Sequence, residues 1–485
     1  MIADTMKLYL TSLGCKLNWA ELESFRRQIT SSGHSVVDDV AQADWAVVNT
    51  CTVTHVAERK SRQTIRRLAR ENPRLRIATV GCYAEVAPDA VGSLEGVALC
   101  VGNQEKRELI SRILATEAES AASDAADPLP EDATPRTRAF CKIQDGCDNQ
   151  CSYCIVTIAR GPQQSEPPER ILAEVRGLVA AGYQEIVLTG VHIGAYGRDA
   201  FGDRPAGGWD LARLVREILK RTAVPRLRLS SIEPWDLSEA LLALWPHPRL
   251  CPHLHLPLQS GCDATLQRMA RRYTSDTFRQ RVMAFRQRVP DGSVTSDVIV
   301  GFPGESDAEF AQSLAFIREI GFARLHVFRY SSRPGTAAAG FSDQIPPQVA
   351  SARSQTMRDA GAAMAQVYHR RLLGRVVPVL FESRVRGRWL GLTDTYVRAT
   401  AASDLDLHNC IVPVQAIRAD AHGIEGEVVS AHPCDPTLVC TAGVSTQMIM
   451  LPKAINRSED NVTERPGFRA ADTWSHGHPP CDLMG

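Results

Sequence analysis

The sequence lacks the features that mark membrane, secreted and disulfide-rich proteins. No apolar run of about 18 residues occurs, so we expect no membrane span. The first residues, Met1–Lys7, contain no apolar segment of the signal-peptide kind and lead into a strand-like pattern. The 14 cysteines are too few for a disulfide scaffold of 485 residues. We therefore expect a cytoplasmic protein, in which clustered cysteines bind metal more often than they form disulfides.

The sequence also lacks an excess of charge of either sign. Lys plus Arg and Asp plus Glu each number 55, so the global charge neither favours nor excludes nucleic acid as a partner. Any RNA-binding surface must be local. One candidate is the basic and aromatic segment Arg384–Trp389, which would suit phosphate contact and base stacking, or be a solvated strand edge.

Three cysteines, Cys147, Cys151 and Cys154, lie within eight residues. A [4Fe-4S] cluster normally takes four thiolates, so three would leave one iron open to a small molecule. A zinc site would need a fourth Cys or His, which this segment does not contain. The spacing, with Tyr153 before the last cysteine, resembles the radical S-adenosylmethionine (SAM) signature, in which SAM binds the open iron.

Three further cysteines each follow a predicted strand in the first part of the chain. These strands are expected at 7–13, 44–50 and 76–80, alternating with helices, which predicts a parallel sheet. Cys15, Cys51 and Cys82 should therefore emerge at one edge of the sheet, where ligands bind. They are a second candidate metal site, although isolated cysteines are often simply buried.

A longer βα alternation follows over 138–372. Its strands are expected at 139–144, 185–189, 226–230, 253–257, 294–300 and 325–329. Six such units predict a partial (β/α) barrel, and the triplet follows its first strand, at the face where barrel active sites lie.

The remaining segments complete an α/β fold with a small all-β barrel. Short strands with Gly and Asp/Asn turns over 373–431 predict that barrel. Residues 116–137 are rich in Ala, Asp, Glu and Pro and are predicted to be a linker. The pattern is lost over 432–485, where we expect a disordered tail.

The two cysteine sets resemble the methylthiotransferase family of radical SAM enzymes, and the likeness extends over about residues 6–431. The shared motifs are Gly14–Asn18, Asn49–Thr54, Gly81–Glu85, Asp145–Cys154, Leu188–His192, Ser231–Pro234, His255–Gly261, Met269–Thr274, Asp297–Glu305 and Ser332–Thr336. Ten motifs in the same order along the chain make this resemblance highly specific.

The resemblance implies three domains and a reaction. Residues 1–115 would be the methylthiotransferase domain with an auxiliary cluster, 138–372 the radical SAM core and 373–431 the RNA-binding TRAM barrel. The cofactors would be two [4Fe-4S] clusters and SAM. The partners would be tRNA, modified at adenosine 37 of the anticodon loop, and an electron donor such as a flavodoxin or ferredoxin. We expect a monomer.

Two segments distinguish among the branches of this family. The branch that acts on N6-threonylcarbamoyladenosine has segments similar to Gly14–Asn18 and Gly391–Tyr396. The isopentenyladenosine branch usually has a Gln-Met pair after the first cysteine. The branch that modifies an aspartate of a ribosomal protein has a Pro-Lys pair. Both branches remain alternatives.

The chemistry explains the cofactors, because the C2–H bond of adenine is strong and not acidic. Our hypothesis is that one SAM methylates a sulfur on the auxiliary cluster and a second SAM yields the radical that removes the C2 hydrogen. SAM should lie across the carboxyl ends of the barrel strands. The candidate contacts with SAM are Thr189, Gly190, Glu233, Gln259 and Ser260. Each of them could equally have a structural role in a turn or in barrel packing. A cluster-containing electron carrier or a zinc RNA-binding protein without catalysis is a further alternative.

Overall fold

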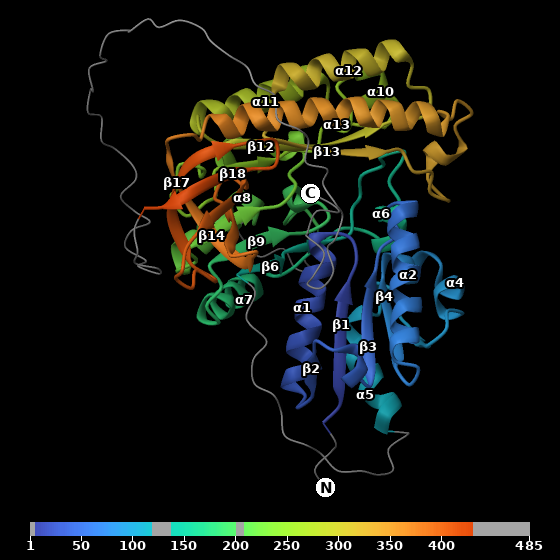
Figure 1. Cartoon of the computed structure of the whole chain (residues 1–485). Helices are drawn as coiled ribbons and strands as arrows, with labels where there is room; N and C mark the ends of the chain where they lie inside the picture. Colours follow the sequence, from blue (N-terminus) through green and yellow to red (C-terminus); the bar gives the residue numbers. More distant parts are fainter. Residues whose placement is uncertain (1–4, 119–136, 200–207, 430–485) are drawn as a thin grey trace, which may run out of the picture.

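The computed structural model describes residues 5–118, 137–199 and 208–429. The predicted tail over 432–485 and most of the predicted linker lie outside these residues. Three bodies follow one another along the chain: an N-terminal parallel sheet, a central strand–helix barrel and a C-terminal all-β barrel (Figure 1).

The N-terminal sheet is parallel with strand order β2-β1-β3-β4-β5. Its strands are β1 (Lys7–Ser12), β2 (Ser35–Val37), β3 (Trp45–Thr50), β4 (Arg76–Gly81) and β5 (Val97–Cys100). Its α-helices are α1 (Lys16–Ser31), α2 (His55–Glu71), α3 (Cys82–Val86), α4 (Pro88–Gly92) and α5 (Leu109–Ala118). Every residue of β3 is buried, as a central strand covered on both faces requires.

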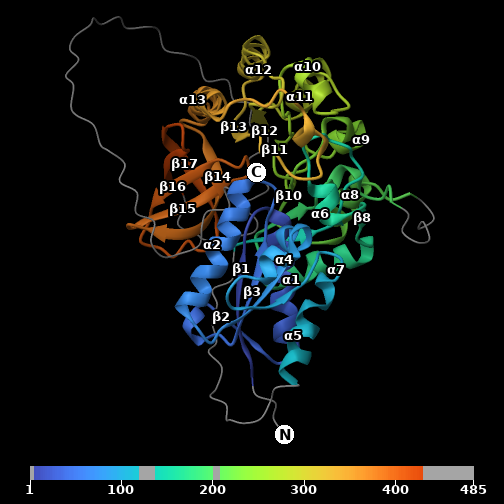
Figure 2. The same cartoon turned by 90° about the vertical axis from the view of Figure 1, so that its right-hand side faces the viewer.

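Helices cover both faces of this sheet. Phe25 and Ile29 of α1 pack with α5 on one face, while Ile65 and Leu68 of α2 pack on the other. Thr54 begins α2 by accepting a hydrogen bond from the Ala57 amide. Figure 2 shows the layers from the side. The sequence predicted the sheet but missed the three-residue strand β2.

The central barrel contains six parallel strands in two sheets, ordered β10-β9-β6 and β11-β12-β13. The strands are β6 (Arg138–Lys142), β9 (Glu185–Thr189), β10 (Arg226–Leu229), β11 (His253–His255), β12 (Ser293–Val300) and β13 (Arg324–Arg329). Single bridges, Leu227 to Leu250 and Ser231 to His255, join the two sheets. The open (β/α) barrel predicted from the sequence is confirmed.

Helices and one small hairpin surround these strands. The helices are α6 (Val156–Arg160), α7 (Pro168–Ala180), α8 (Leu211–Arg221), α9 (Glu239–Leu242), α10 (Asp263–Arg268), α11 (Ser275–Arg288), α12 (Asp307–Ile320) and α13 (Pro347–Arg370). The hairpin consists of β7 (Gln144–Asp145) and β8 (Gln164–Ser165). Short 3-10 turns complete the described part at Val40–Gln42, Lys106–Glu108, Ile193–Ala195, Pro234–Asp236 and Ala337–Gly340. Among the described residues, none of the helices is both long and apolar enough to cross a membrane.

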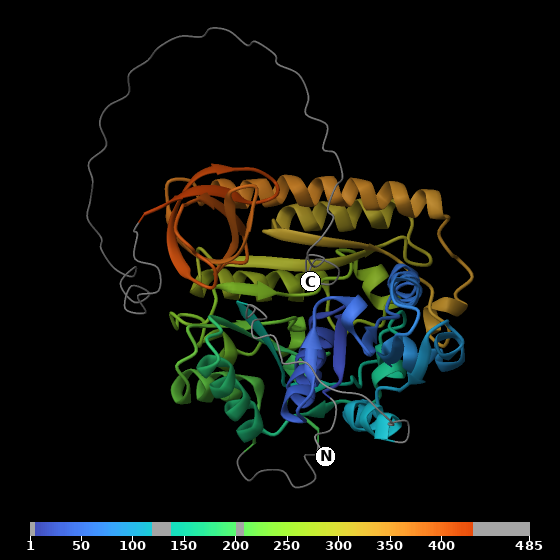
Figure 3. The ribbon, with the colours of Figure 1, turned by 60° about the horizontal axis from the view of Figure 1, so that its bottom comes forward.

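The C-terminal strands close into a barrel in the order β14-β15-β16-β18-β17, seen as a ring in Figure 3. They are β14 (Val376–Val385), β15 (Arg388–Thr393), β16 (Arg398–Ala402), β17 (Ile411–Ala419) and β18 (Ile424–Val428). The sequence predicted this barrel, although the separate strand β15 was not recognised.

The C-terminal barrel packs on the amino ends of the central strands. Arg226 at the start of β10 donates to the Pro378 carbonyl at 2.8 Å, and Arg228 donates to the Asp394 carbonyl at 2.9 Å. The hydroxyl of Ser293, at the start of β12, donates to the Thr395 carbonyl at 2.6 Å. The opposite, carboxyl ends of the strands therefore face the N-terminal sheet and the cysteine triplet.

Candidate active site

The predicted triplet lies in the loop between β7 and α6, beyond the carboxyl end of β6. The Cys147 amide donates to the Gly161 carbonyl at 3.1 Å, and the Asn149 amide donates to the Cys147 sulfur at 3.4 Å. Burial and the neighbouring Cys151 raise the pKa of Cys154 to about 12. The loop thus holds three thiols close enough to interact electrostatically.

Arg271 links this loop to the barrel rim. Its guanidinium donates to the Cys151 sulfur at 3.4 Å and pairs with the carboxylate of Glu233. It also lies 4.9 Å from the Trp235 ring centre and 5.1 Å from that of Tyr273. A positive charge is therefore fixed beside the triplet by aromatic faces as well as by a carboxylate.

His192 is a second polar group at the triplet. Its Nε2 lies 2.5 Å from Asp236 Oδ2, and its Nδ1 lies 3.3 Å from Asn149 Nδ2. Burial lowers its pKa, but the hydrogen bonds to Asp236 and Cys147 outweigh burial and raise the pKa to about 9. Asp236 therefore orients the His192 ring and favours its protonated form.

Two of the five predicted SAM contacts lie where β9 ends beside the triplet. Thr189 is the last residue of β9, and its carbonyl accepts the Ile143 amide at 2.9 Å. At Gly190 an added Cβ would lie 2.8 Å from the Gln144 carbonyl oxygen, so only glycine fits against that segment. Gln144, which the sequence did not single out, also accepts the His192 amide at 2.8 Å.

The other three predicted contacts lie in the segments that follow β10 and β11. Glu233 follows β10 and pairs with Arg271. Gln259 has a φ of 62°, and its amide donates to the Asp297 carbonyl at 2.8 Å. Ser260 is buried, and its hydroxyl accepts the Cys262 amide at 3.2 Å. The structure thus links Glu233 to the triplet through Arg271, whereas the Ser260 hydroxyl serves a local turn.

The second predicted set also converges. Cys51 and Cys82 directly follow β3 and β4, and Cys15 follows β1. Burial and the neighbouring Cys82 and Cys15 thiols raise the pKa of Cys51. An added Cβ at Gly14 would lie 2.7 Å from the Cys51 sulfur, and Gly14 has a φ of 94°. Glycine is therefore required where the first loop passes the second cysteine.

Asn18 joins the loops that carry these thiols. Its side-chain amide donates to the Leu13 carbonyl at 2.8 Å and to the Thr50 carbonyl at 3.1 Å. Its oxygen accepts from Arg160 at 2.6 Å. Arg160 belongs to α6, the helix directly after the triplet. Its guanidinium therefore connects that helix to Asn18, which holds the loops of the N-terminal cysteines.

A buried ion network surrounds Arg160. Its guanidinium lies 3.0 Å from Glu21 and 2.8 Å from Asp145, and its side chain is 2% exposed. Lys106 pairs with the same two carboxylates at 2.6 Å and 2.5 Å. Burial alone would raise the pKa of Glu21, but Arg160 and Lys106 hold it well below its usual range. The network was not predicted, because its members come from four separate elements.

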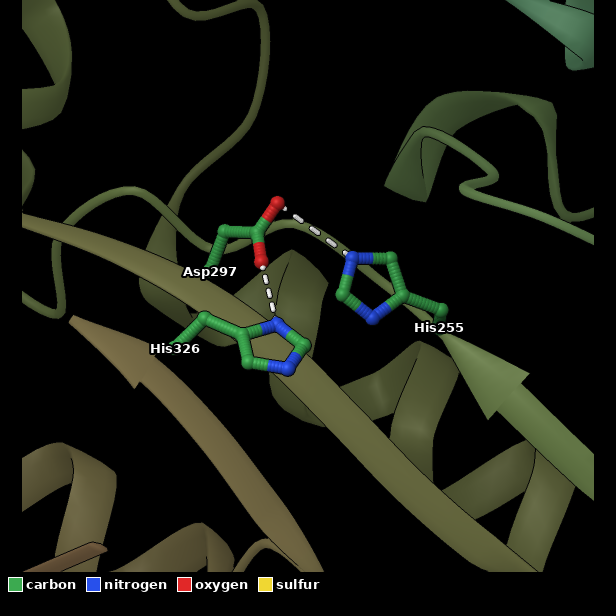
Figure 4. A group of neighbouring side chains, drawn as sticks. All are labelled: His255, Asp297 and His326. Carbon is green, nitrogen blue, oxygen red and sulfur yellow. Dashed lines mark hydrogen bonds and ion pairs between the residues drawn. The ribbon is translucent and has the colours of Figure 1, made fainter. Parts of the chain in front are cut away.

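His255, Asp297 and His326 point toward one another inside the barrel (Figure 4). Asp297 Oδ1 lies 2.9 Å from His326 Nδ1, and Oδ2 lies 3.3 Å from His255 Nε2. The spacing could accommodate a cation, but the carboxylate already bridges the two imidazoles. Burial lowers the pKa of His326 more than Asp297 raises it.

A cavity of about 640 Å³ lies between the N-terminal sheet domain and β13. Its walls include Gly14 and Lys60 on one side and His326, Phe328 and Tyr330 on the other. It lies next to the Cys15 loop and is lined by aromatic and basic side chains, which suits a nucleobase.

Comparisons with known proteins agree with this architecture. The radical SAM superfamily model matches residues 141–317, and the model of the uncharacterised family UPF0004 matches residues 7–103. The threonylcarbamoyladenosine tRNA methylthiotransferase MtaB of Bacillus subtilis is 35% identical over 435 residues, which cover 86% of this chain and 95% of that relative. The chain belongs to the radical SAM methylthiotransferase family.

Other relatives extend the comparison. MtaB of Thermotoga maritima is 36% identical over 398 residues, covering 80% of this chain and 90% of that protein. The tRNA-2-methylthio-N(6)-dimethylallyladenosine synthase of Cereibacter sphaeroides is 33% identical over 408 residues, covering 81% and 92%. The solved radical SAM methyltransferase TsrM of Kitasatospora setae shares the fold, with a TM-score of 0.50, 14% identity, and coverage of 67% of this chain and 73% of that one.

Family membership confirms the predicted enzyme class, so the chain is a radical SAM methylthiotransferase. The cofactors expected from the sequence, SAM and [4Fe-4S] clusters, are those of this family. The non-catalytic carrier and zinc-protein alternatives are thereby excluded.

Proposed function

We propose that this methylthiotransferase converts N6-threonylcarbamoyladenosine at position 37 of tRNA to its C2-methylthio derivative, with SAM as methyl donor and radical source. The observation that carries the proposal is the pair of cysteine triplets, each at the carboxyl ends of a parallel sheet and joined through Arg160. The choice of nucleoside rests on the MtaB relatives at 35% and 36% identity.

The six cysteines are the proposed cluster ligands: Cys15, Cys51 and Cys82 for the auxiliary cluster, and Cys147, Cys151 and Cys154 for the SAM-binding cluster. Both sets of cysteines suit a [4Fe-4S] cluster, because each offers three thiols and no carboxylate. An arginine also lies by each set: Arg271 donates to Cys151, and Arg160 interacts with the charges of Cys82 and Cys15. Thiolates and the negative cluster they bind need such a positive environment.

When bound, the clusters and SAM supply a carbon radical strong enough to remove the C2 hydrogen and a methylated sulfur to replace it. The protein's own residues position these groups. Gly190 lets the end of β9 pack against the Gln144 segment, while Arg271 fixes Glu233 where it can accept from a ribose hydroxyl or an amine. Asp236 holds His192 as a donor toward the triplet.

The β14–β15 hairpin is the proposed RNA contact of the C-terminal barrel. Its turn contains Arg386 and Gly387, both with positive φ, and Arg384 lies 5.9 Å from the Trp389 ring centre. Arg388 pairs with Glu425 at 2.8 Å, whereas Arg384 makes only a long, exposed pair with Asp404 at 4.0 Å, so Arg384 and Arg386 are the better candidates for phosphate. We further propose a monomer that acts in the cytoplasm with a flavodoxin or ferredoxin as electron donor.

Nucleoside mass spectrometry of bulk tRNA, with and without the gene, tests the proposal. Deletion should remove the methylthio form of threonylcarbamoyladenosine and leave its precursor. Loss of the methylthio form of isopentenyladenosine would support that branch instead. Unchanged tRNA with loss of a modified aspartate in a ribosomal protein would contradict an RNA substrate.

A triple variant tests the division of labour between the cysteine sets. Cys15→Ala, Cys51→Ala and Cys82→Ala together should abolish methylthio transfer, while formation of 5′-deoxyadenosine from SAM persists. Product from this variant would refute the sulfur-supplying role of the N-terminal site.

A further inference from the structure

Lys16 lies where the three bodies of the protein meet. It is the first residue of α1, directly after Cys15, and is only 6% exposed. Its ammonium lies 5.4 Å from the ring centre of Tyr396, in the turn between β15 and β16 of the C-terminal barrel. The Tyr396 ring in turn stacks on buried His253 at the start of β11, with 5.0 Å between centres. A residue next to Cys15 therefore reaches the amino ends of the central strands, where the C-terminal barrel packs.

Besides Lys16, Arg138 and Arg228 contact the Tyr396 ring, and each of these arginines has a carboxylate partner. Arg138 lies 5.9 Å from the ring centre and pairs with Glu382 at 2.6 Å. Arg228 lies 4.9 Å from the ring centre and pairs with Glu185 at 2.7 Å. Within the described ranges, Lys16 has no carboxylate at ion-pair distance, and its ammonium lies over the Tyr396 ring instead. One positive charge is left uncompensated at this point.

Two neighbouring groups, His253 and Asp297, do not balance that charge. Burial and nearby positive groups, including Arg228 and Lys16, hold the pKa of His253 well below its usual value, so His253 stays neutral. The carboxylate of Asp297 bridges His255 and His326. Burying an ammonium without a counter-charge is costly, and an aromatic face offsets only part of that cost. An anion beside Lys16 would offset that cost.

We propose that Lys16 binds the carboxylate of the threonyl group of the substrate and thereby selects threonylcarbamoyladenosine. The proposal rests on the proposed function, because that substrate carries a free carboxylate on its N6 substituent. In adenine, N6 and C2 lie on either side of N1, so the substituent extends from the edge of the ring that must face the sulfur donor. A lysine adjacent to Cys15 is placed to meet it.

Lys16 also explains discrimination against the isopentenyl substrate. That substituent is apolar and uncharged, so it would leave the ammonium desolvated and unpaired. The two segments by which the sequence resembles the threonylcarbamoyladenosine branch, Gly14–Asn18 and Gly391–Tyr396, meet here through Lys16 and Tyr396. Their separation along the chain hides the contact from sequence alone.

The test uses anaerobically reconstituted enzyme and two anticodon stem-loop RNAs. One carries threonylcarbamoyladenosine, and the other carries its methyl ester, which removes the negative charge and adds one methyl group. We expect the enzyme to bind the acid about 10- to 100-fold more tightly than the ester by fluorescence anisotropy, as a buried charge-assisted hydrogen bond implies. Lys16→Met should bind both RNAs as weakly as the wild type binds the ester, whereas Lys16→Arg should keep most of the preference.

Lys220→Met is the matched control, because Lys220 is exposed on the barrel helix α8. It should keep the full preference for the acid. Equal wild-type binding of acid and ester would overturn the proposal without any variant, and so would a Lys16→Met protein that still prefers the acid. If instead the wild type binds RNA but forms no methylthio product from the acid, the proposed function fails.

Discussion

Replacing Arg160 by methionine removes the guanidinium that joins the two cysteine sites. The side chain is 2% exposed and donates to Asn18 at 2.6 Å, to Glu21 at 3.0 Å and to Asp145 at 2.8 Å. Truncating one partner of a buried ion pair costs about 3–5 kcal/mol, because the remaining charge stays buried. Since Lys106 still pairs with Glu21 and Asp145, we expect the lower end, about 3 kcal/mol.

The measurement is urea unfolding of the reconstituted protein under anaerobic conditions, followed by tryptophan fluorescence. Arg67→Met is the matched control, because Arg67 on α2 makes an exposed pair with Glu71 at 3.1 Å. Such a pair contributes about 0.3–0.5 kcal/mol. If Arg160→Met is no more destabilising than Arg67→Met, the network does not hold the two sites together.

The pH dependence gives a second readout of the same network. Arg160 and Lys106 depress the pKa of Glu21. Ionised Glu21 therefore contributes to the free energy of unfolding above the ordinary carboxyl pKa, and this contribution is lost as pH falls through the depressed pKa. Without Arg160 that pKa should rise, so acid unfolding of Arg160→Met should begin at a higher pH. An unchanged acid transition would contradict this assignment.

Two further predictions concern other parts of the molecule. Arg228 outweighs burial and lowers the pKa of Glu185 from 4.5 to about 2, so Glu185→Gln should lose about 3 kcal/mol of unfolding free energy at neutral pH. That difference should shrink as pH falls from 4.5 toward 2, and a constant difference in pH-dependent unfolding curves would refute it. Arg384→Ala should weaken binding of the stem-loop RNA and reduce the slope of log affinity against log salt by about 1, whereas an unchanged slope would remove Arg384 from the phosphate contacts.

The sequence predicted the parts of the site that follow from local pattern. Cys15, Cys51 and Cys82 could be assigned to one sheet edge because each follows a strand, and a parallel sheet brings those ends together. The six barrel strands were visible as apolar runs. The strands β2 and β15 were missed, one because it has three residues and the other because a tight turn separates it from β14.

Contacts between distant segments could not be predicted in this way. Arg160 lies outside the ten motifs given for the sequence, and its partners Glu21 and Lys106 carry no local signal. The meeting of Lys16 with Tyr396 depends on how the C-terminal barrel closes the amino ends of the central strands. Periodicity describes an element and its exposed face, but it carries no information on which elements meet.

Iron analysis of the anaerobically reconstituted protein tests the central claim, that the chain holds two three-cysteine clusters. The account predicts about eight irons per chain, falling to about four when Cys15, Cys51 and Cys82 are all replaced by alanine. About four irons in the wild type, or no loss of iron in the triple variant, would contradict it.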